Sequence, residues 1–166
     1  MNIRPAQLND VYAMSSLARL LSKKYITGDF SAEAAKLFLD SLTPETLINN
    51  MATDISYLVA EKEGTVIGFV GIKDFYHLFH LFVAEAFQRQ GIARKLWQAV
   101  MTECLLSGND GEFTVNSSLY AQPLYEKLGF VAESGPQEKN KILTIPMKLS
   151  VTELKKSNNL STVFQE

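Results

Sequence analysis

One stretch of sequence decides the fold of this chain, Leu81-Phe82-Val83-Ala84-Glu85-Ala86-Phe87-Gln88-Arg89-Gln90-Gly91-Ile92-Ala93-Arg94. Its first residues are apolar, as in a buried strand, and from Ile92 to Leu105 apolar residues recur at helical spacing. Gly108 follows at a point where helices commonly end. The stretch therefore predicts a strand that passes through a short loop into the N-terminus of an amphipathic helix.

The turn in this stretch has the composition of an anion site. Free backbone N–H groups at the start of a helix attract negative charge, and the small residues Gly91 and Ala93 let a ligand approach them. Arg89 and Arg94 add positive charge, so the pattern indicates pyrophosphate binding. Neither Gly-x-Gly-x-x-Gly nor Gly-Lys-Ser/Thr is present. The alternative is that Gly91 and Ala93 are only small residues at the start of a helix, and that the arginines belong to a solvated cationic face without a ligand.

Two motifs together resemble a known family. Gln88-x-x-Gly91-x-Ala93 resembles the acetyl-CoA signature of the GCN5-related N-acetyltransferases (GNAT), which opens the helix after the fourth strand. Downstream, Leu124-Tyr125-Glu126-Lys127-Leu128-Gly129-Phe130 is similar to the penultimate helix of that family and its exit. The motifs occur in the family's order, and the resemblance covers residues 3–149.

The resemblance implies an α/β (α+β) architecture, the GNAT fold. We expect a mixed, mostly antiparallel twisted sheet of six to seven strands flanked by about four helices. The N-acetyltransferase domain is expected over residues 1–149, followed by a tail, 150–166, that is a helix or flexible. The residues themselves predict a hairpin of strands 55–61 and 65–73 around Gly64, and further strands at 77–83 and 113–117. A closing strand pair is expected at 130–132 and 141–149.

The resemblance also implies acetyl-CoA as cosubstrate, without a metal. The pyrophosphate would be held by the turn, and the backbone of the preceding strand would align the pantetheine arm. Ser118 matches a position that often contacts the cofactor, with Asn116 as the alternative. The implied cofactor-binding residues are Leu81, Phe82, Val83, Gln88, Arg89, Gln90, Gly91, Ile92, Ala93, Arg94 and Ser118.

Tyr125 matches the family tyrosine that protonates the departing thiolate, since a phenol keeps its proton at pH 7. Half-buried packing is its alternative role, and Tyr120 is a second candidate one turn earlier. Residues 113–117 hold no acid that could serve as general base, and Glu85 and Glu112 only flank the strands. His77 is the candidate base, because imidazole titrates near physiological pH.

The base assignment has alternatives. By the two-residue alternation of a strand, His80 is expected to face away from His77. A structural role for each histidine and a water relay without a dedicated base stay open. Two histidines on opposite faces, with no third ligand nearby, indicate no metal site.

Composition excludes several classes of protein. With 166 residues and a net charge of −2, the chain has no basic stripe for nucleic acid. The single cysteine, Cys104, lies on the apolar helix stripe and is expected to pack rather than react. No apolar run reaches the length of a membrane span and no signal peptide precedes the first strand, which predicts a cytoplasmic protein without membrane partners.

The sequence thus predicts an N-acetyltransferase that acts on a primary amine of a small molecule or peptide, by direct attack in a ternary complex. A non-catalytic acyl-CoA-binding sensor of the same fold is the alternative. An interaction protein that uses the tail after Ser150 is a third, and a homodimer is left open. Tyr25, Phe30 and Phe38 lie where the family forms its acceptor wall, and would otherwise be core aromatics.

Overall fold

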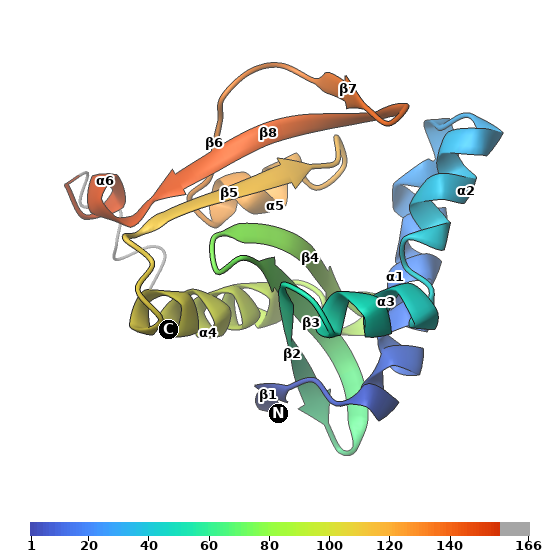
Figure 1. The fold of residues 1–166 in the computed structure, drawn as a ribbon, viewed down its shortest axis with the longest axis horizontal. Helices are drawn as coiled ribbons and strands as arrows, with labels where there is room; N and C mark the ends of the chain where they lie inside the picture. The colour runs from blue at the N-terminus through green and yellow to red at the C-terminus, as the bar shows by residue number, and fades with distance from the viewer. Residues whose placement is uncertain (157–166) are drawn as a thin grey trace.

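The computed structural model describes residues 1–156 as one eight-stranded sheet flanked by helices (Figure 1). The strands run in the spatial order β1-β2-β3-β4-β5-β8-β6, with β7 paired to β8. Residues 157–166, the end of the expected tail, lie outside the described residues. The strands are β1 (Asn2–Pro5), β2 (Ile55–Lys62), β3 (Thr65–Lys73), β4 (His77–Val83), β5 (Glu112–Ser117), β6 (Val131–Ala132), β7 (Gln137–Lys139) and β8 (Ile142–Ser150). The helices are α1 (Val11–Tyr25), α2 (Ala32–Asp40), α3 (Pro44–Met51), α4 (Ile92–Leu106), α5 (Gln122–Lys127) and α6 (Val151–Lys156).

The first half of the sheet is an antiparallel meander of β1 to β4. The hairpin between β2 and β3 turns at Glu63 and Gly64, whose φ angles of 51° and 77° are those of a two-residue loop matched to strand twist. This confirms the predicted hairpin. The predicted strand at 77–83 and the helix beginning at Ile92 also have the bounds that the sequence indicated.

The helices divide between the two faces of the sheet. One buried cluster joins α4 and α5 to the sheet, with Trp97 fully buried at its centre against Phe113 and Phe130. The other joins α1 and α3 to β2 and β3 through Met14, Leu47 and other apolar side chains. No helix among residues 1–156 is long and apolar enough to cross a membrane.

The strand and helix counts exceed the expectation of six to seven strands and about four helices. The strand β7 escaped prediction because its residues, Gln137–Lys139, are polar and exposed on both faces and pair only with β8. Helix α6 occupies the start of the expected tail. Helix α5 begins at Gln122; before it, Ser118 accepts a hydrogen bond from the N–H of Ala121, which closes a turn.

A bulge in β4 and the divergence of β4 from β5 shape the centre of the sheet. Gly71 pairs with His80 and Ile72 with Leu78, so Phe79 is the extra residue on β4. On its other side β4 pairs with β5 in parallel only at His77 and Leu78. Beyond that point β5 stays on β8 and leaves β4, so a wedge opens between the two strands (Figure 1).

Candidate functional site

The free edge of β4 forms one wall of the wedge. The N–H of Ala84 donates to the carbonyl of Ile67 at 2.8 Å, so by the alternation of antiparallel pairing Phe82 also directs its N–H and C=O to β3. Leu81 and Val83, the intervening residues, direct theirs into the wedge. An extended ligand can therefore pair with Leu81 and with the N–H of Val83, whereas the backbone of Phe82 is engaged by β3.

The turn between β4 and α4 presents unpaired N–H groups. Arg89 and Gly91 have φ angles of 61° and 77°, and the N–H groups of residues 89–93 find no acceptor among residues 1–156. Such a concave run of N–H groups at a helix N-terminus favours an anion. A Cβ on Gly91 would meet no atom within 4 Å, so open space lies beside the turn. These features fit a pyrophosphate.

The side chain of Gln88 has a structural role in this turn. Its Nε2 donates to the carbonyl of Val83 at 2.9 Å, which ties the turn to the end of β4. The family resemblance implies that Gln88 binds the cofactor. In the structure its side-chain amide has a protein partner, which holds the turn against the end of β4.

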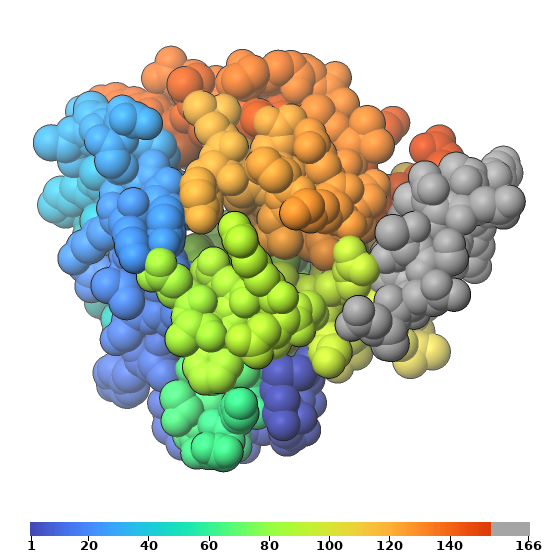
Figure 2. All heavy atoms as spheres, turned by 180° about the vertical axis from the view of Figure 1, so that it is seen from behind, coloured from blue at the N-terminus to red at the C-terminus, as the bar shows by residue number. Residues whose placement is uncertain are grey.

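Three chain segments meet at the open end of the wedge. The ring of Tyr25, at the end of α1, stacks on Tyr120, which follows β5, with ring centroids 5.0 Å apart. The carboxylate of Glu85, after β4, accepts hydrogen bonds from Lys24 and from the hydroxyl of Tyr25. Figure 2 shows the corresponding blue, green and orange segments adjoining on this face. Tyr120 is therefore engaged with α1, while Tyr125 lies elsewhere.

Tyr125 belongs to the buried cluster that contains Leu81 and Val83. Its side chain is 8% exposed, and its ring packs edge-on against Phe130. Burial raises the pKa of Tyr125, so the phenol keeps its proton at pH 7. No hydrogen bond to the Tyr125 hydroxyl is found within residues 1–156, and its oxygen is not among the fully buried side-chain atoms that lack a partner, so this atom is accessible although its ring is buried.

The two histidines lie on one face of β4, which corrects the expectation that they face apart. The extra residue at Phe79 resets the alternation: Leu78, Leu81 and Val83 face α4, whereas His80 packs among the aromatic rings of the opposite face. His77 shares that face, because its partner Thr114 alternates with residues of β5 that face α4. A bulge cannot be read from residue spacing alone.

The histidines differ in their surroundings. His77 Nδ1 lies 2.7 Å from Thr114 Oγ1, and burial, with the nearby charges of Lys73 and Lys139, lowers the pKa of His77. His80 Nδ1 lies 3.0 Å from Tyr57 Oη, and burial lowers the pKa of His80 to about 3. Both shifts favour the neutral imidazole at pH 7, and a pKa of about 3 places His80 outside the range in which it could exchange protons near neutral pH.

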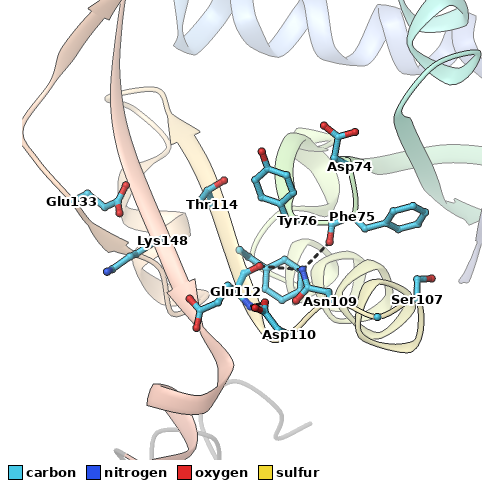
Figure 3. Close-up of a pocket in the computed structure, with 12 residues that line it drawn as sticks. Asp74, Phe75, Tyr76, Ser107, Asn109, Asp110, Glu112, Thr114, Glu133 and Lys148 are labelled. Atoms are coloured by element: carbon cyan, nitrogen blue, oxygen red, sulfur yellow. Dashed lines mark hydrogen bonds between the residues drawn. The ribbon is translucent and has the colours of Figure 1, made fainter.

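Two cavities adjoin the sheet, and neither histidine lines them. One of about 540 Å³ lies at the start of β4 and β5; it is lined by Tyr76, Thr114 and several acidic side chains (Figure 3). The side-chain amide of Asn109 connects two segments that line this cavity, because it donates hydrogen bonds to the carbonyls of Phe75 and Glu112 at 2.9 and 3.0 Å. The other cavity, of about 500 Å³, lies between α2 and the turn from β7 to β8, where Phe38 and Lys141 line it.

Two further predictions concern single residues. Ser118 Oγ accepts the N–H of Ala121, so this hydroxyl has a structural role at the start of α5. Cys104 is fully buried and burial raises its pKa to about 11, which confirms it as a packing residue. In residues 1–156, no three His, Cys, Asp or Glu side chains are grouped as metal ligands.

Sequence reasoning missed the hydroxyl partners of the histidines. Thr114 lies 37 residues from His77, and Tyr57 lies 23 residues from His80. Tyr57 also accepts a hydrogen bond from Asn50 on α3. The sequence indicated Thr114 only weakly, as a polar residue between apolar neighbours in the strand predicted at 113–117.

Comparison with known proteins gives a consistent picture. Residues 26–151 match the family described as the acetyltransferase (GNAT) domain. No curated protein matches the sequence.

Several solved structures are similar in fold. A GCN5-related N-acetyltransferase from Rhodopseudomonas palustris superposes with a TM-score of 0.75 at 20% identity, over 90% of this chain and 95% of that one. The PaiA N-acetyltransferase from Thermoplasma acidophilum, in complex with coenzyme A, gives 0.74 at 20% identity over 90% and 98%. YncA from Salmonella typhimurium, with its cofactor acetyl-CoA, gives 0.62 at 21% identity over 91% and 94%. At these identities the likeness concerns the fold.

Proposed function

Because the chain belongs to the acetyltransferase (GNAT) domain family, we propose that it is an N-acetyltransferase that uses acetyl-CoA to acetylate a primary amine of a small molecule or peptide. The observation that carries the proposal is the continuity of the wedge. Unpaired N–H groups at residues 89–93 adjoin the free edge of β4 at Val83 and Leu81. The coenzyme A and acetyl-CoA complexes of structures with the same fold support the choice of donor.

The turn and the free strand edge bind the donor in this proposal. Gln88 sets the turn, the N–H groups of residues 89–93 hold the pyrophosphate, and Arg89 and Arg94 add positive charge. Leu81 and Val83 pair with the pantetheine arm through their backbone. An outward N–H at Leu81 is then the candidate donor to the oxygen of the thioester carbonyl, on which negative charge develops. Ile92 and Ala93 contribute backbone, so their side chains stay apolar.

Tyr125 acts as the general acid. When bound, acetyl-CoA supplies an acyl group on a thiol leaving group. Tyr125 donates its proton to the sulfur as the C–S bond breaks, and takes back the proton that the new amide nitrogen must lose. Its unpartnered hydroxyl supports this role, and the raised pKa of Tyr125 means that the phenol carries its proton at pH 7.

His77 acts as the general base from the other face of the sheet. An amine with a pKa near ~10 arrives as an ammonium ion and must lose one proton before it attacks. His77 accepts that proton on Nε2 while its Nδ1 is engaged with Thr114. The amine then forms the C–N bond from the face of the sheet that carries α1 to α3, and the thiol leaves toward the face that carries α5. This arrangement requires both substrates to be bound together. We assign the activity to residues 1–149.

Amine-dependent thiol release tests the proposal. Purified protein with saturating acetyl-CoA should release free thiol faster when a panel of small amines and peptide N-termini is added. At least one acceptor should raise the rate by orders of magnitude over hydrolysis. Acetyl-CoA binding without release for any acceptor would favour the sensor, and absence of acetyl-CoA binding would refute both readings.

A further inference from the structure

The chain holds only two histidines, and both are on β4. The bulge at Phe79 places them on one face, and in each the Nδ1 atom faces a hydroxyl group from a neighbouring strand. The distances are 2.7 Å from His77 to Thr114 Oγ1 on β5 and 3.0 Å from His80 to Tyr57 Oη on β2. Since a neutral imidazole carries its proton on only one nitrogen, these hydroxyl groups can determine the tautomer of each histidine.

The donor count around Tyr57 fixes the tautomer of His80. Asn50 Nδ2 donates to Tyr57 Oη at 3.1 Å. Because burial raises the pKa of Tyr57 to about 12, its hydroxyl keeps a proton, which remains available for His80. This favours donation from Tyr57 to His80 Nδ1, with the proton of His80 on Nε2. Gly71 makes this contact possible, since a Cβ there would lie 2.5 Å from the ring of Tyr57.

The surroundings of Thr114 favour the opposite arrangement at His77. Thr114 lines the 540 Å³ cavity, so its hydroxyl proton can turn to that space while its oxygen accepts a hydrogen bond. The contact is also built into the sheet: His77 and Thr114 are register partners, and the N–H of Thr114 donates to the carbonyl of Tyr76 at 3.0 Å. This is the point at which the wedge begins.

If His77 acts as a base, its hydrogen bond to Thr114 should persist after the imidazole is protonated. When His77 Nδ1–H donates to Thr114, the bond persists after Nε2 takes a proton, because both nitrogens of the imidazolium ion are donors. If Thr114 donated to Nδ1 instead, protonation would break the bond. Acceptance by Thr114 is therefore the arrangement that favours proton uptake at Nε2.

We propose that Thr114 is a positioning residue, which holds His77 as the Nδ1–H tautomer with the Nε2 lone pair free, while Tyr57 holds His80 in the opposite tautomer. The inference rests on the proposed function only in the use made of His77 as the base. It divides the two histidines of one strand into a proton acceptor and a structural group.

The charged groups around His77 act on its pKa independently of Thr114. Lys73 on β3 and Lys139 on β7 oppose protonation, whereas Asp74, in the loop before β4, favours it. The rings of Tyr76 and Phe79 complete the surroundings. Because substitution of Thr114 leaves all of these charges in place, a change in the pKa of His77 would report on the hydroxyl itself.

Nitrogen NMR of the imidazole rings tests the assignment directly. In ¹⁵N-labelled protein at pH 7, long-range ¹H–¹⁵N spectra should show two imidazoles of opposite tautomer, assigned with His80→Gln. Thr114→Val should lower the pKa of His77 and shift its proton toward Nε2, and leave His80 unchanged. Thr114→Ser should restore the wild-type pattern. Tyr57→Phe should alter His80 and leave His77 unchanged.

Activity provides the second readout. For an amine that the wild type acetylates, Thr114→Val should lower kcat/KM at neutral pH about tenfold and Thr114→Ser should recover most of it. An Nε2–H tautomer for His77 in the wild type, or an unchanged His77 spectrum in Thr114→Val, would overturn the proposal. The predicted spectra combined with full activity of His77→Gln would instead refute the role of His77 as base and leave the tautomer assignment intact.

Discussion

At the scale of single residues, burial distinguishes two groups that have the same chemistry. His77 and His80 lie on the same face, yet burial lowers the pKa of His80 to about 3, beyond use in proton transfer at neutral pH. The pKa of His77 is lowered as well, by burial first and then by Lys73 and Lys139. A base must be neutral to accept a proton, so the direction of this shift favours activity at pH 7.

The pH profile of His77→Gln follows from that direction. In the wild type, kcat/KM should fall only as the pH drops through the lowered pKa of His77, below the ordinary histidine value near ~6.5. His77→Gln should lower kcat/KM at neutral pH about a hundredfold and remove this acid limb. His80→Gln should keep the acid limb, because His80 does not titrate in this range. An acid limb that persists in His77→Gln would contradict the assignment.

Tyr125→Phe should separate chemistry from binding. The substitution removes one unpartnered hydroxyl from a packed ring, so the fold and the affinity for acetyl-CoA should change little. Without the proton donor, kcat should fall about a hundredfold. Steady-state kinetics with calorimetric titration of acetyl-CoA checks both. Tyr120→Phe is a matched control, since that ring stacks on Tyr25 outside the proposed acid position. An unchanged kcat in Tyr125→Phe would assign proton donation elsewhere.

At the scale of elements, the passage from β4 to α4 combines three features that the proposed donor site requires. The divergence of β5 frees the edge of β4, Gln88 ties the turn to Val83, and left-handed φ angles at Arg89 and Gly91 direct N–H groups outward. None of these features alone makes a binding site. Together they give an extended ligand a strand to pair with and an anion site one turn further on.

Gly91→Glu should abolish acetyl-CoA binding. The glutamate would place a side chain and a negative charge in the open space beside the unpaired N–H groups. Gly64→Glu is a close control in the β2–β3 hairpin, because Gly64 also has a φ of 77° and a Cβ there would likewise meet no atom within 4 Å. Both variants carry similar strain, about 1 kcal/mol or more. Calorimetry should show binding in Gly64→Glu and none in Gly91→Glu; equal affinities would refute the site.

The sequence predicted the elements that local patterns control, and missed those that depend on neighbouring strands. The hairpin at Gly64, the strand ending at Val83 and the helix from Ile92 follow from turn chemistry and apolar spacing. The side of the sheet that His80 faces depends on a bulge. The hydrogen bond of Gln88 and the contact of Thr114 with His77 depend on how the chain segments are placed in the folded protein. Polar, exposed β7 carries no apolar pattern, so only its pairing with β8 defines it.

At the scale of the whole molecule, the ion pairs of Arg4 connect the first strand to its neighbours. Arg4 on β1 donates to Asp10 at 2.8 Å and to Glu61 on β2 at 2.6 Å. Asp10 is 7% exposed, and the Arg4 guanidinium holds the pKa of its carboxyl below the usual value. Asp10 precedes α1 but its side chain does not cap the helix; its carboxylate accepts hydrogen bonds from Arg4 and from the N–H of Gln7.

Asp10→Asn should therefore destabilise the fold at neutral pH by about 1–3 kcal/mol, because Arg4 loses a buried charged partner. A carboxyl whose pKa is lower in the folded than in the unfolded state stabilises above its unfolded pKa, near ~3.9, and this contribution is lost as the pH falls through the folded value. The difference between variant and wild type should shrink below pH ~4. Urea unfolding at several pH values measures it, and a difference independent of pH would contradict the account.

The most direct test of the whole account is the fate of the acetyl group. Purified protein would be incubated with isotopically labelled acetyl-CoA and a panel of primary amines, and the products identified by mass spectrometry. The account predicts that the label appears on the nitrogen of at least one amine, with one free thiol released for each amide formed. Label found only in acetate or retained in acetyl-CoA, with the donor bound, would contradict it and identify a protein that binds the donor without transferring its acetyl group.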